Sequence, residues 1–258
     1  MTEKISAGVY KLICETAGTK ANHNVGQLIP VDYIQNLQYG EITEVLILGE
    51  DIEDIEHFRE RVLEKYYSDL ASNGNVASYK EWVNSLQGVG GVKIYRAFAQ
   101  GGYVGLTIQD SEYGVPTQEL INYVAQAIDP ENSHGEGNGR APFGHYVTVR
   151  GVTARTVNIS AHFSFQSGYS FEELKPTIIQ EINKYFLEEN KNWASYQLPY
   201  SRVTETGHIL LKIAKAEAAI INIKGVANVE NLKYNNVASS LELGSDEIAK
   251  LGEITNES

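Results

Sequence analysis

Cysteine is nearly absent from this 258-residue sequence, in which Cys14 is the single example. One thiol cannot form an internal disulfide framework, and without a second cysteine at C-x-x-C spacing it cannot build a structural zinc site of the usual kind. The fold must therefore rest on burial of apolar side chains, and a chain of this length can bury about three quarters of its unfolded surface. This cysteine usage fits a reducing compartment.

Long apolar runs and excess positive charge are also missing. No stretch of about 18 apolar residues occurs, and residues 1–9 lack the basic and apolar pattern of a secretory signal. Lysine and arginine number 21 against 33 aspartates and glutamates, which gives a net charge of -12. This charge opposes phosphate backbones, and no basic patch with interleaved aromatic residues offsets it. We expect no nucleic acid and no membrane as a partner, and weak repulsion between copies.

Tyrosine, by contrast, is frequent, with 16 copies beside one methionine. The amphipathic tyrosine ring is favoured at protein interfaces, so the count suggests contact surfaces. Ordinary drift in composition explains the same count without a function. Residues 190–203 are polar and aromatic, and we interpret them as an ordered loop. The candidate interface residues in this loop are Trp193, Tyr196 and Tyr200. The alternative is that these rings fold back to cover the neighbouring helix.

Hydrophobic periodicity predicts an α+β fold in which helices pack on one face of several small mixed sheets. Residues 1–50 are expected to form a β-rich N-terminal region, residues 51–150 an α/β middle domain and residues 151–258 an α/β C-terminal domain. The clearest strand signal is the alternation of apolar and polar side chains at residues 155–165. Helices are predicted at residues 50–70, 75–87, 116–128, 170–187 and around 218–223, and strands at residues 9–14, 42–48, 92–96, 103–109, 145–150, 155–165, 209–213, 226–234, 239–243 and near Ile254.

Several residues mark where helices begin and end. Asn75 is a good N-cap, and Ser170 with Glu173 has the spacing of a capping box. Gly88 and Gly225 each follow a helical pattern and precede a strand, where a glycine in the left-handed conformation ends a helix. These two helix–glycine–strand units echo each other, although such units are common in unrelated proteins.

The helix predicted at residues 50–70 has an apolar face, formed by Ile55, Phe58, Val62 and Tyr66. Acidic residues crowd the start of this helix, where the macrodipole stabilises negative charge. A divalent-cation cluster is the functional alternative for these acids, which are Asp51, Glu53, Asp54 and Glu56.

The loop at residues 131–145 is the best place for an active site, because it combines glycines with His134, Glu136 and His145. It follows a helix and precedes a strand, the reverse of what a phosphate-binding loop needs, and it lacks the Gly-Lys-Ser/Thr ending. A metal site made of these three side chains is chemically possible, but their spacing matches no familiar ligand set. We expect glycines that turn the backbone and solvated histidines, with no catalytic, metal or cofactor-binding residue. A metal-dependent enzyme that uses His134 and His145 is the alternative function.

A series of short motifs runs along nearly the whole chain. An acidic stretch at residues 49–54 precedes Phe58-Arg59-Glu60-Arg61, and further motifs follow at residues 74–79, 88–95, 115–130, 141–145, 222–226 and 252–254. No single motif is decisive, but in order and spacing they resemble the baseplate J-like family of contractile phage tails. The chain is most similar to members from Gram-positive prophages or tail bacteriocins.

The resemblance implies a structural wedge protein of the tail baseplate, made in the bacterial host cytoplasm and without a catalytic role. Such a protein pairs with a second copy of itself and with other wedge proteins, forms a ring around the central hub, and passes a conformational change to the sheath. Family members usually have a further N-terminal segment, so we expect a truncated or short variant here. The Ile-Pro that the family has before its last strand reads Ile248-Ala249. A third reading, a glycan-binding module, would require exposed aromatic side chains that form a groove.

Overall fold

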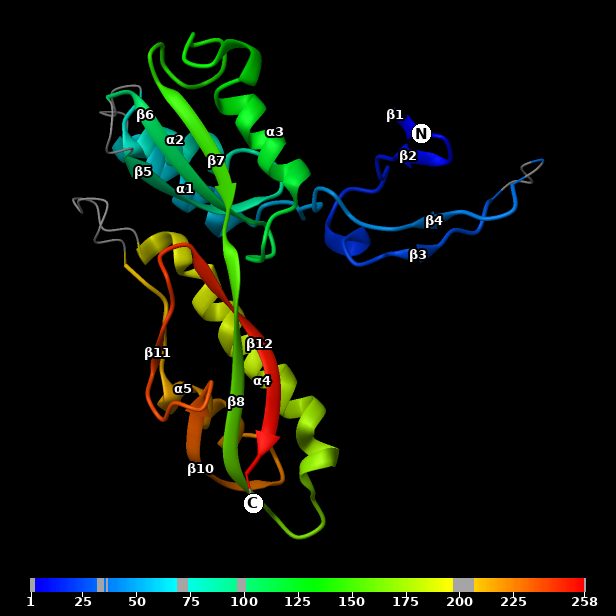
Figure 1. Cartoon of the computed structure of the whole chain (residues 1–258), viewed down its shortest axis with the longest axis vertical. Helices are drawn as coiled ribbons and strands as arrows, with labels where there is room; N and C mark the ends of the chain where they lie inside the picture. The colour runs from blue at the N-terminus through cyan, green and yellow to red at the C-terminus, as the bar shows by residue number, and fades with distance from the viewer. Residues whose placement is uncertain are drawn as a thin grey trace.

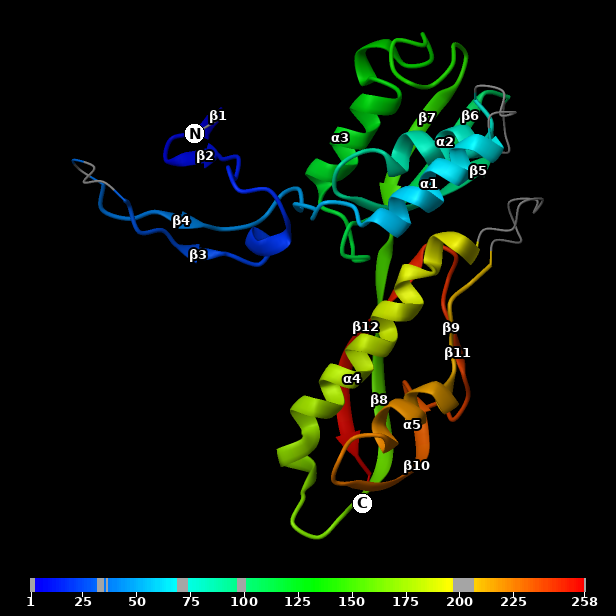
Figure 2. The same cartoon turned by 180° about the vertical axis from the view of Figure 1, so that it is seen from behind.

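The computed structural model describes residues 3–31, 35, 37–68, 74–96, 101–196 and 207–257. Figures 1 and 2 show an N-terminal region of extended segments, a middle domain, and a C-terminal domain connected to the middle domain by one long strand. Helices and several small mixed sheets make up the two domains, which confirms the predicted fold class. Within the described ranges, no helix has the length and apolarity required to cross a membrane.

The N-terminal region contains two short antiparallel hairpins. β1 (Glu3–Ser6) pairs with β2 (Val9–Lys11), and β3 (Gly26–Gln27) pairs with β4 (Glu41–Ile42). A short 3-10 turn, η1 (Thr19–Ala21), lies between the hairpins. The second hairpin projects away from both domains (Figure 1). Of the strand predicted at residues 42–48, only Ile42 belongs to β4.

The middle domain packs two helices on one face of a three-stranded sheet. In this sheet β5 (Val89–Arg96) is antiparallel, and β7 (Tyr146–Gly151) parallel, to the central β6 (Tyr103–Asp110). The apolar stripes of α2 (Val76–Asn84) and α3 (Gln118–Ile128) meet alternate residues of the strands in one core. That core includes Tyr79, Val83, Val92, Ile94, Leu106, Ile108, Leu120, Val124, Ile128 and Val147.

The C-terminal domain has the same kind of sheet around the longest strand. The central β8 (Thr153–Phe165) is antiparallel to β10 (Val226–Tyr234) and parallel to β12 (Glu247–Asn256). α4 (Phe171–Lys191) and α5 (Ile213–Ile221) lie on one face of this sheet (Figure 2). The apolar side chains of β8 that were predicted to face the core are buried: Val157, Ile159, Ala161 and Phe163. On the face predicted to meet water, Asn158 and His162 are exposed, but Ser160 is buried because its hydroxyl donates to Glu257 (2.7 Å).

Two further short elements complete this domain. β9 (Leu210–Leu211) pairs with β11 (Leu241–Glu242), apart from the main sheet. The 3-10 turn η3 (Trp193–Tyr196) follows α4, so the segment predicted as a loop begins with ordered helical turns. α4 itself continues to Lys191, beyond the predicted end at residue 187, because Glu189 and Asn190 in its last turn are buried.

Gly88 and Gly225 occupy equivalent places in the two domains. Each lies three residues after the C-cap of its helix, Ser85 in one case and Asn222 in the other, and directly before a strand. Their φ angles are +85° and +101°, in the left-handed region that favours glycine. In both domains the strand that follows pairs antiparallel with the central strand. The predicted helix–glycine–strand units are therefore confirmed.

The first predicted helix, α1, begins at Ile55 (Ile55–Ser68) and not at residue 50. Glu50 and Asp51 lie outside the helix because their carboxylates accept backbone N–H groups of Gly88 (2.6 Å) and Thr19 (2.9 Å). The N–H group of Thr19, together with its hydroxyl, lowers the pKa of Asp51. These acids join distant parts of the chain to one another.

The apolar face of α1 is exposed. Ile55, Phe58 and Val62, which the sequence places on one face of this helix, all have exposed side chains. The side chain of Tyr66 lies outside the described residues. Periodicity shows that a helix has an apolar face but not what covers it.

Candidate functional site

A buried carboxylate holds the glycine-rich loop at residues 131–145. Asp129, which follows α3, accepts hydrogen bonds from the N–H groups of Gly135 (3.0 Å) and Val147 (2.8 Å). The same carboxylate lies 2.6 Å from Nδ1 of His134. Asp129 therefore ties the start of the loop, with its short 3-10 turn η2 (Glu131–Ser133), to the strand that follows it.

His145 has a different partner at the other end of this loop. Its Nδ1 lies 2.8 Å from the hydroxyl of Tyr79 on α2, and the two rings are stacked. Burial, with a smaller contribution from the charge of Asp129, raises the pKa of Tyr79 to about 12. Both histidines are hydrogen-bonded within the fold. His134 is nevertheless exposed, as predicted, whereas His145 is half-buried.

Metal binding finds no support in this geometry. In the part of the chain that the structure describes, no three histidine, cysteine, aspartate or glutamate side chains are placed to hold a metal ion together. Glu136, the third residue of the alternative metal site, is exposed. The loop geometry is that of a folded connection between α3 and β7.

Trp193, the first of the predicted interface residues, is fully buried. Its indole N–H donates to the carbonyl oxygen of Ser245 (2.9 Å), and Nζ of Lys93 lies 4.6 Å from the ring centroid. The ring is therefore part of a contact between the two domains of this chain. The side chain of Tyr196 and the whole of Tyr200 lie outside the described residues, so an intermolecular contact of this loop stays a prediction.

The sheet face opposite α2 and α3 is polar, and the C-terminal domain covers it. Lys93 on β5 and Thr107 and Gln109 on β6 are fully buried, although they alternate with the apolar residues that face the helices. Lys93 donates to the carbonyl oxygen of Ser245 (2.8 Å), and burial lowers its pKa to about 8. Gly91 leaves room for η3, because a Cβ at that position would lie 3.0 Å from the Cβ of Ala194.

One tight turn of the C-terminal domain, which we call the clasp turn (residues 244–247), closes onto this polar face. The carboxylate of Asp246 accepts hydrogen bonds from the hydroxyl of Tyr95 (2.5 Å) and the guanidinium of Arg150 (2.5 Å). Its backbone carbonyl accepts the N–H of Thr153, where β8 begins (2.9 Å). The clasp turn thus contacts β5, β7 and β8 together.

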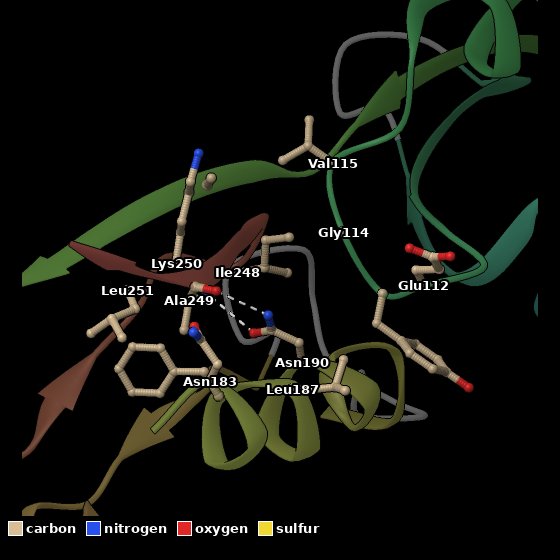
Figure 3. A pocket seen from close by; sticks show the side chains of 13 residues that line it. Glu112, Gly114, Val115, Asn183, Leu187, Asn190, Ile248, Ala249, Lys250 and Leu251 are labelled. Atoms are coloured by element: carbon tan, nitrogen blue, oxygen red, sulfur yellow. Dashed lines mark hydrogen bonds between the residues drawn. The ribbon is translucent and has the colours of Figure 1, made fainter. Parts of the chain in front are cut away.

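A groove of about 450 Å³ separates the domains elsewhere along the junction. Residues 112–115 of the middle domain form one wall, and the C-terminal half of α4 with the start of β12 forms the other (Figure 3). Asn190 joins α4 to β12 in this wall, donating to the carbonyl oxygen of Ala249 (3.0 Å) and accepting its N–H (2.9 Å). The two domains therefore do not pack closely over their whole junction.

Exposed apolar side chains gather on the N-terminal region and α1. Among the described residues before Tyr79, no apolar side chain is buried, and Val31 and Ile29 are 100% and 88% exposed. Bonds between this region and the middle domain include those from Asn22 to Glu112 (3.0 Å) and from the hydroxyl of Thr117 to the carbonyl oxygen of Leu46 (2.5 Å). Exposed apolar surface on this scale marks a contact site. Its other members are Ile5, Val9, Tyr10, Leu12, Ile13, Val25, Leu28, Leu37, Tyr39, Ile52, Ile55, Phe58, Val62 and Leu63.

Two adjacent segments of the chain match one protein family. Residues 71–151 match its "Baseplate J-like central domain", and residues 157–257 match its "Baseplate J-like protein C-terminal domain". The chain belongs to the baseplate J-like family. In this baseplate J-like chain the matched segments meet where β7 leads into β8, which is also where the clasp turn closes.

Relatives of this baseplate J-like chain include proteins of two bacteria. It is 30% identical over 249 residues to "Uncharacterized protein YqbT" of Bacillus subtilis (strain 168), covering 94% of this chain and 65% of that protein. It is 28% identical, with the same coverage, to "Phage-like element PBSX protein XkdT" of that organism. It is 27% identical to "Putative protein JayE" of Escherichia coli (strain K12), covering 84% of each. The chain thus spans 65% of the length of the two Bacillus relatives.

A solved structure of the same fold is the "Cryo-EM structure of the anti-feeding prophage (AFP) baseplate, 6-fold symmetrised". One chain of it superposes with a TM-score of 0.50 at 10% identity, covering 89% of this chain and 48% of that chain. At such low identity the likeness concerns the fold alone. The family resemblance inferred from the order of the motifs is confirmed.

Sequence reasoning missed the domain junction of this baseplate J-like protein. Lys93, Thr107 and Arg150 stand at alternate strand positions, a pattern typical of a sheet face that meets water. The available signal was Gly91, because a glycine inside a strand often marks the close approach of another element.

Proposed function

We propose that this chain is a structural wedge component of the baseplate of a phage-like contractile tail. Membership of the baseplate J-like family and the printed name of the PBSX relative support a place in a phage-like tail. The fold shared with a chain of the AFP baseplate is compatible with that place. The proposed role is assembly and not catalysis, which membership of this structural family supports.

The observation that carries this proposal is the exposed apolar surface of the N-terminal region. A two-stranded hairpin is marginally stable in water by itself, and no described residue of the projecting hairpin of β3 and β4 belongs to either hydrophobic core. A neighbouring molecule that covers these side chains would gain about 25 cal/mol for each Å² of apolar surface removed from water. The proposed neighbours are a second copy of this chain and other wedge proteins, in a ring around the central hub and next to the sheath. The chain would be made in the host cytoplasm and reside in the tail baseplate.

The test replaces Ile29 and Val31 by aspartate in the tail-producing bacterium. We expect few or no complete tails, while the purified double variant keeps its melting temperature, because both side chains are almost fully exposed. Phe143→Asp is the matched control, since Phe143 is also exposed but lies on the glycine-rich loop of the middle domain. Normal tail yield from the double variant would contradict the proposal.

A further inference from the structure

We infer that the junction between the middle and C-terminal domains is a two-position joint, which the clasp turn holds in its closed position. Within the described residues, the chain passes from the middle domain to the C-terminal domain at one point, where β7 leads through Val152 into β8 (Figure 1). Closure seats Asp246 against Tyr95 and Arg150. Opening bends the chain at residues 151–153 and exposes the polar face of the middle-domain sheet to water.

The closed contact buries polar groups that would be better hydrogen-bonded in water. Lys93 is fully buried, and its ammonium donates to the carbonyl oxygens of Ser245 (2.8 Å) and Gly207 (3.2 Å). Gln109 is also fully buried, and within the described residues neither atom of its side-chain amide has a hydrogen-bond partner. Burying such groups costs free energy that hydration returns when the joint opens. Burial of these groups therefore destabilises the closed position relative to the open one.

Asp246 and Trp193 stabilise the closed position against this cost. The carboxylate of Asp246 receives one bond from a hydroxyl and one charge-assisted bond from a guanidinium, and charge-assisted bonds are the stronger kind. Trp193 adds a fully buried ring that lies against the ammonium of Lys93. These contacts stabilise the closed joint. Loss of the Asp246 carboxylate changes charge without removing apolar packing.

The groove beside the junction gives the domains room to move. Its volume of about 450 Å³ lies between residues 112–115 and the start of β12. Interfaces between domains of one chain that are polar and incompletely packed permit relative motion. The C-terminal domain can therefore rotate toward this groove while both cores stay intact.

A labelling experiment on the full chain measures the solvent access of Lys93. The protein receives short pulses of an amine-reactive ester, and mass spectrometry follows each lysine. In Asp246→Asn we expect Lys93 to react roughly tenfold faster, because the loss of a charge-assisted bond shifts an equilibrium by about that factor. Exposed Lys224 serves as the internal reference and should react at an unchanged rate. Glu253→Gln is the matched control variant, since it removes an exposed carboxylate from β12 and should leave Lys93 protected.

A cross-link separates opening of the joint from unfolding of a domain. Gly91→Cys with Ala194→Cys, in a Cys14→Ser background, places two Cβ atoms 3.0 Å apart across the junction. A disulfide needs about 3.5–4.5 Å between Cβ atoms, so a small relaxation suffices. In the oxidised protein, Asp246→Asn should no longer speed the modification of Lys93.

Either of two results would contradict the proposed two-position joint. Lys93 could stay protected in Asp246→Asn, or it could react fast even in the oxidised chain, which would mean that the middle domain itself unfolds. Continued protection of Lys93 in Asp246→Asn would contradict the proposal even if the cross-link does not form. The experiment needs only the isolated chain, so its outcome is independent of the proposed place in a tail.

Discussion

At single positions, local backbone geometry limits which residue the chain accepts. Gly88 and Gly225 have φ angles of +85° and +101°, where any other side chain is strained. A Cβ atom at either position would also lie very close to a neighbouring side chain. A Cβ at Gly225 would lie 2.6 Å from Cδ1 of Tyr169, and a Cβ at Gly88 would lie 3.0 Å from Cγ2 of Ile47.

Gly88→Ala and Gly225→Ala should each lower the free energy of unfolding by about 1 kcal/mol or more. The loss should be larger at Gly225, because the ring of Tyr169 must move. Urea unfolding followed by circular dichroism measures both values. Gly105→Ala is the control, since its Cβ would lie at an ordinary 3.5 Å from the Cβ of Tyr95. Parent-like unfolding of both variants would show that these glycines are dispensable.

Lys93 gives the chain a pH dependence of defined sign. Burial lowers its pKa from 10.5 to about 8 in the folded chain, although the charge of Asp246 acts in the opposite direction. Between these two values the unfolded chain binds more protons than the folded chain, so the free energy of unfolding rises with pH. Urea unfolding at pH values of about 7.5 and 9.5 should show this rise in the parent and a smaller one in Lys93→Met. The tyrosines titrate in both proteins, so the difference between them reports Lys93. Equal rises would mean that Lys93 is hydrated in the folded chain.

Residue roles that depend on neighbours in the sequence could be predicted, and roles that depend on another domain could not. Asn75 caps α2 as expected, with its side chain accepting the N–H of Ser78. Gly88 takes the expected left-handed conformation. Trp193 was a candidate interface residue, and within this chain it is buried because the middle-domain sheet lies against η3. No spacing within the sequence around Trp193 indicates that contact.

At the scale of elements, apolar stripes located the helices well but left their surroundings open. α3 and α1 both have the period of an amphipathic helix, but α3 packs on β7 while the apolar face of α1 is exposed. The difference arises from contacts between distant segments, which periodicity does not encode. The same limit applies to residues 42–48, whose β-branched composition is typical of a strand although most of them are outside β4.

Asn190 shows how one side chain connects two elements. It is buried at the end of α4, and its amide satisfies both the N–H and the carbonyl oxygen of Ala249 on β12. Ala249 lies inside β12 and donates this N–H group, which a proline at residue 249 could not do.

Asn190→Leu should lower the free energy of unfolding by about 2 kcal/mol or more, because two buried backbone groups lose their partners. Chemical denaturation of the full chain measures this loss. Asn183→Ala, on an exposed position of α4 in the same groove, should change the value by less than about 0.5 kcal/mol. A similar small change in Asn190→Leu would mean that water replaces the amide at Ala249.

At the scale of the whole molecule, fold class and family followed from patterns spread along the chain. The relation between the domains did not, because the clasp turn brings Asp246 to Tyr95 and Arg150 across more than ninety residues of sequence. The exposure of the N-terminal region could not be predicted from the sequence either. Its short strands and apolar residues are those of an ordinary β-rich segment, and only the structure shows that they lack a core.

Net charge and exposed apolar surface act in opposite directions on self-association. The net charge of -12 keeps copies apart, whereas Ile29 and Val31 favour contact. Salt shortens the range of the repulsion from about 10 Å at 0.1 M to about 3 Å at 1 M, without weakening apolar contacts. We expect the isolated chain to be a monomer or weak oligomer at low salt and to associate more strongly at about 0.5 M salt, as measured by sedimentation velocity. Ile29→Asp with Val31→Asp should abolish the salt effect, and Phe143→Asp should retain it. A parent chain that stays monomeric at every salt concentration would show that the N-terminal surface does not drive self-association. The partner of this surface would then be a different protein.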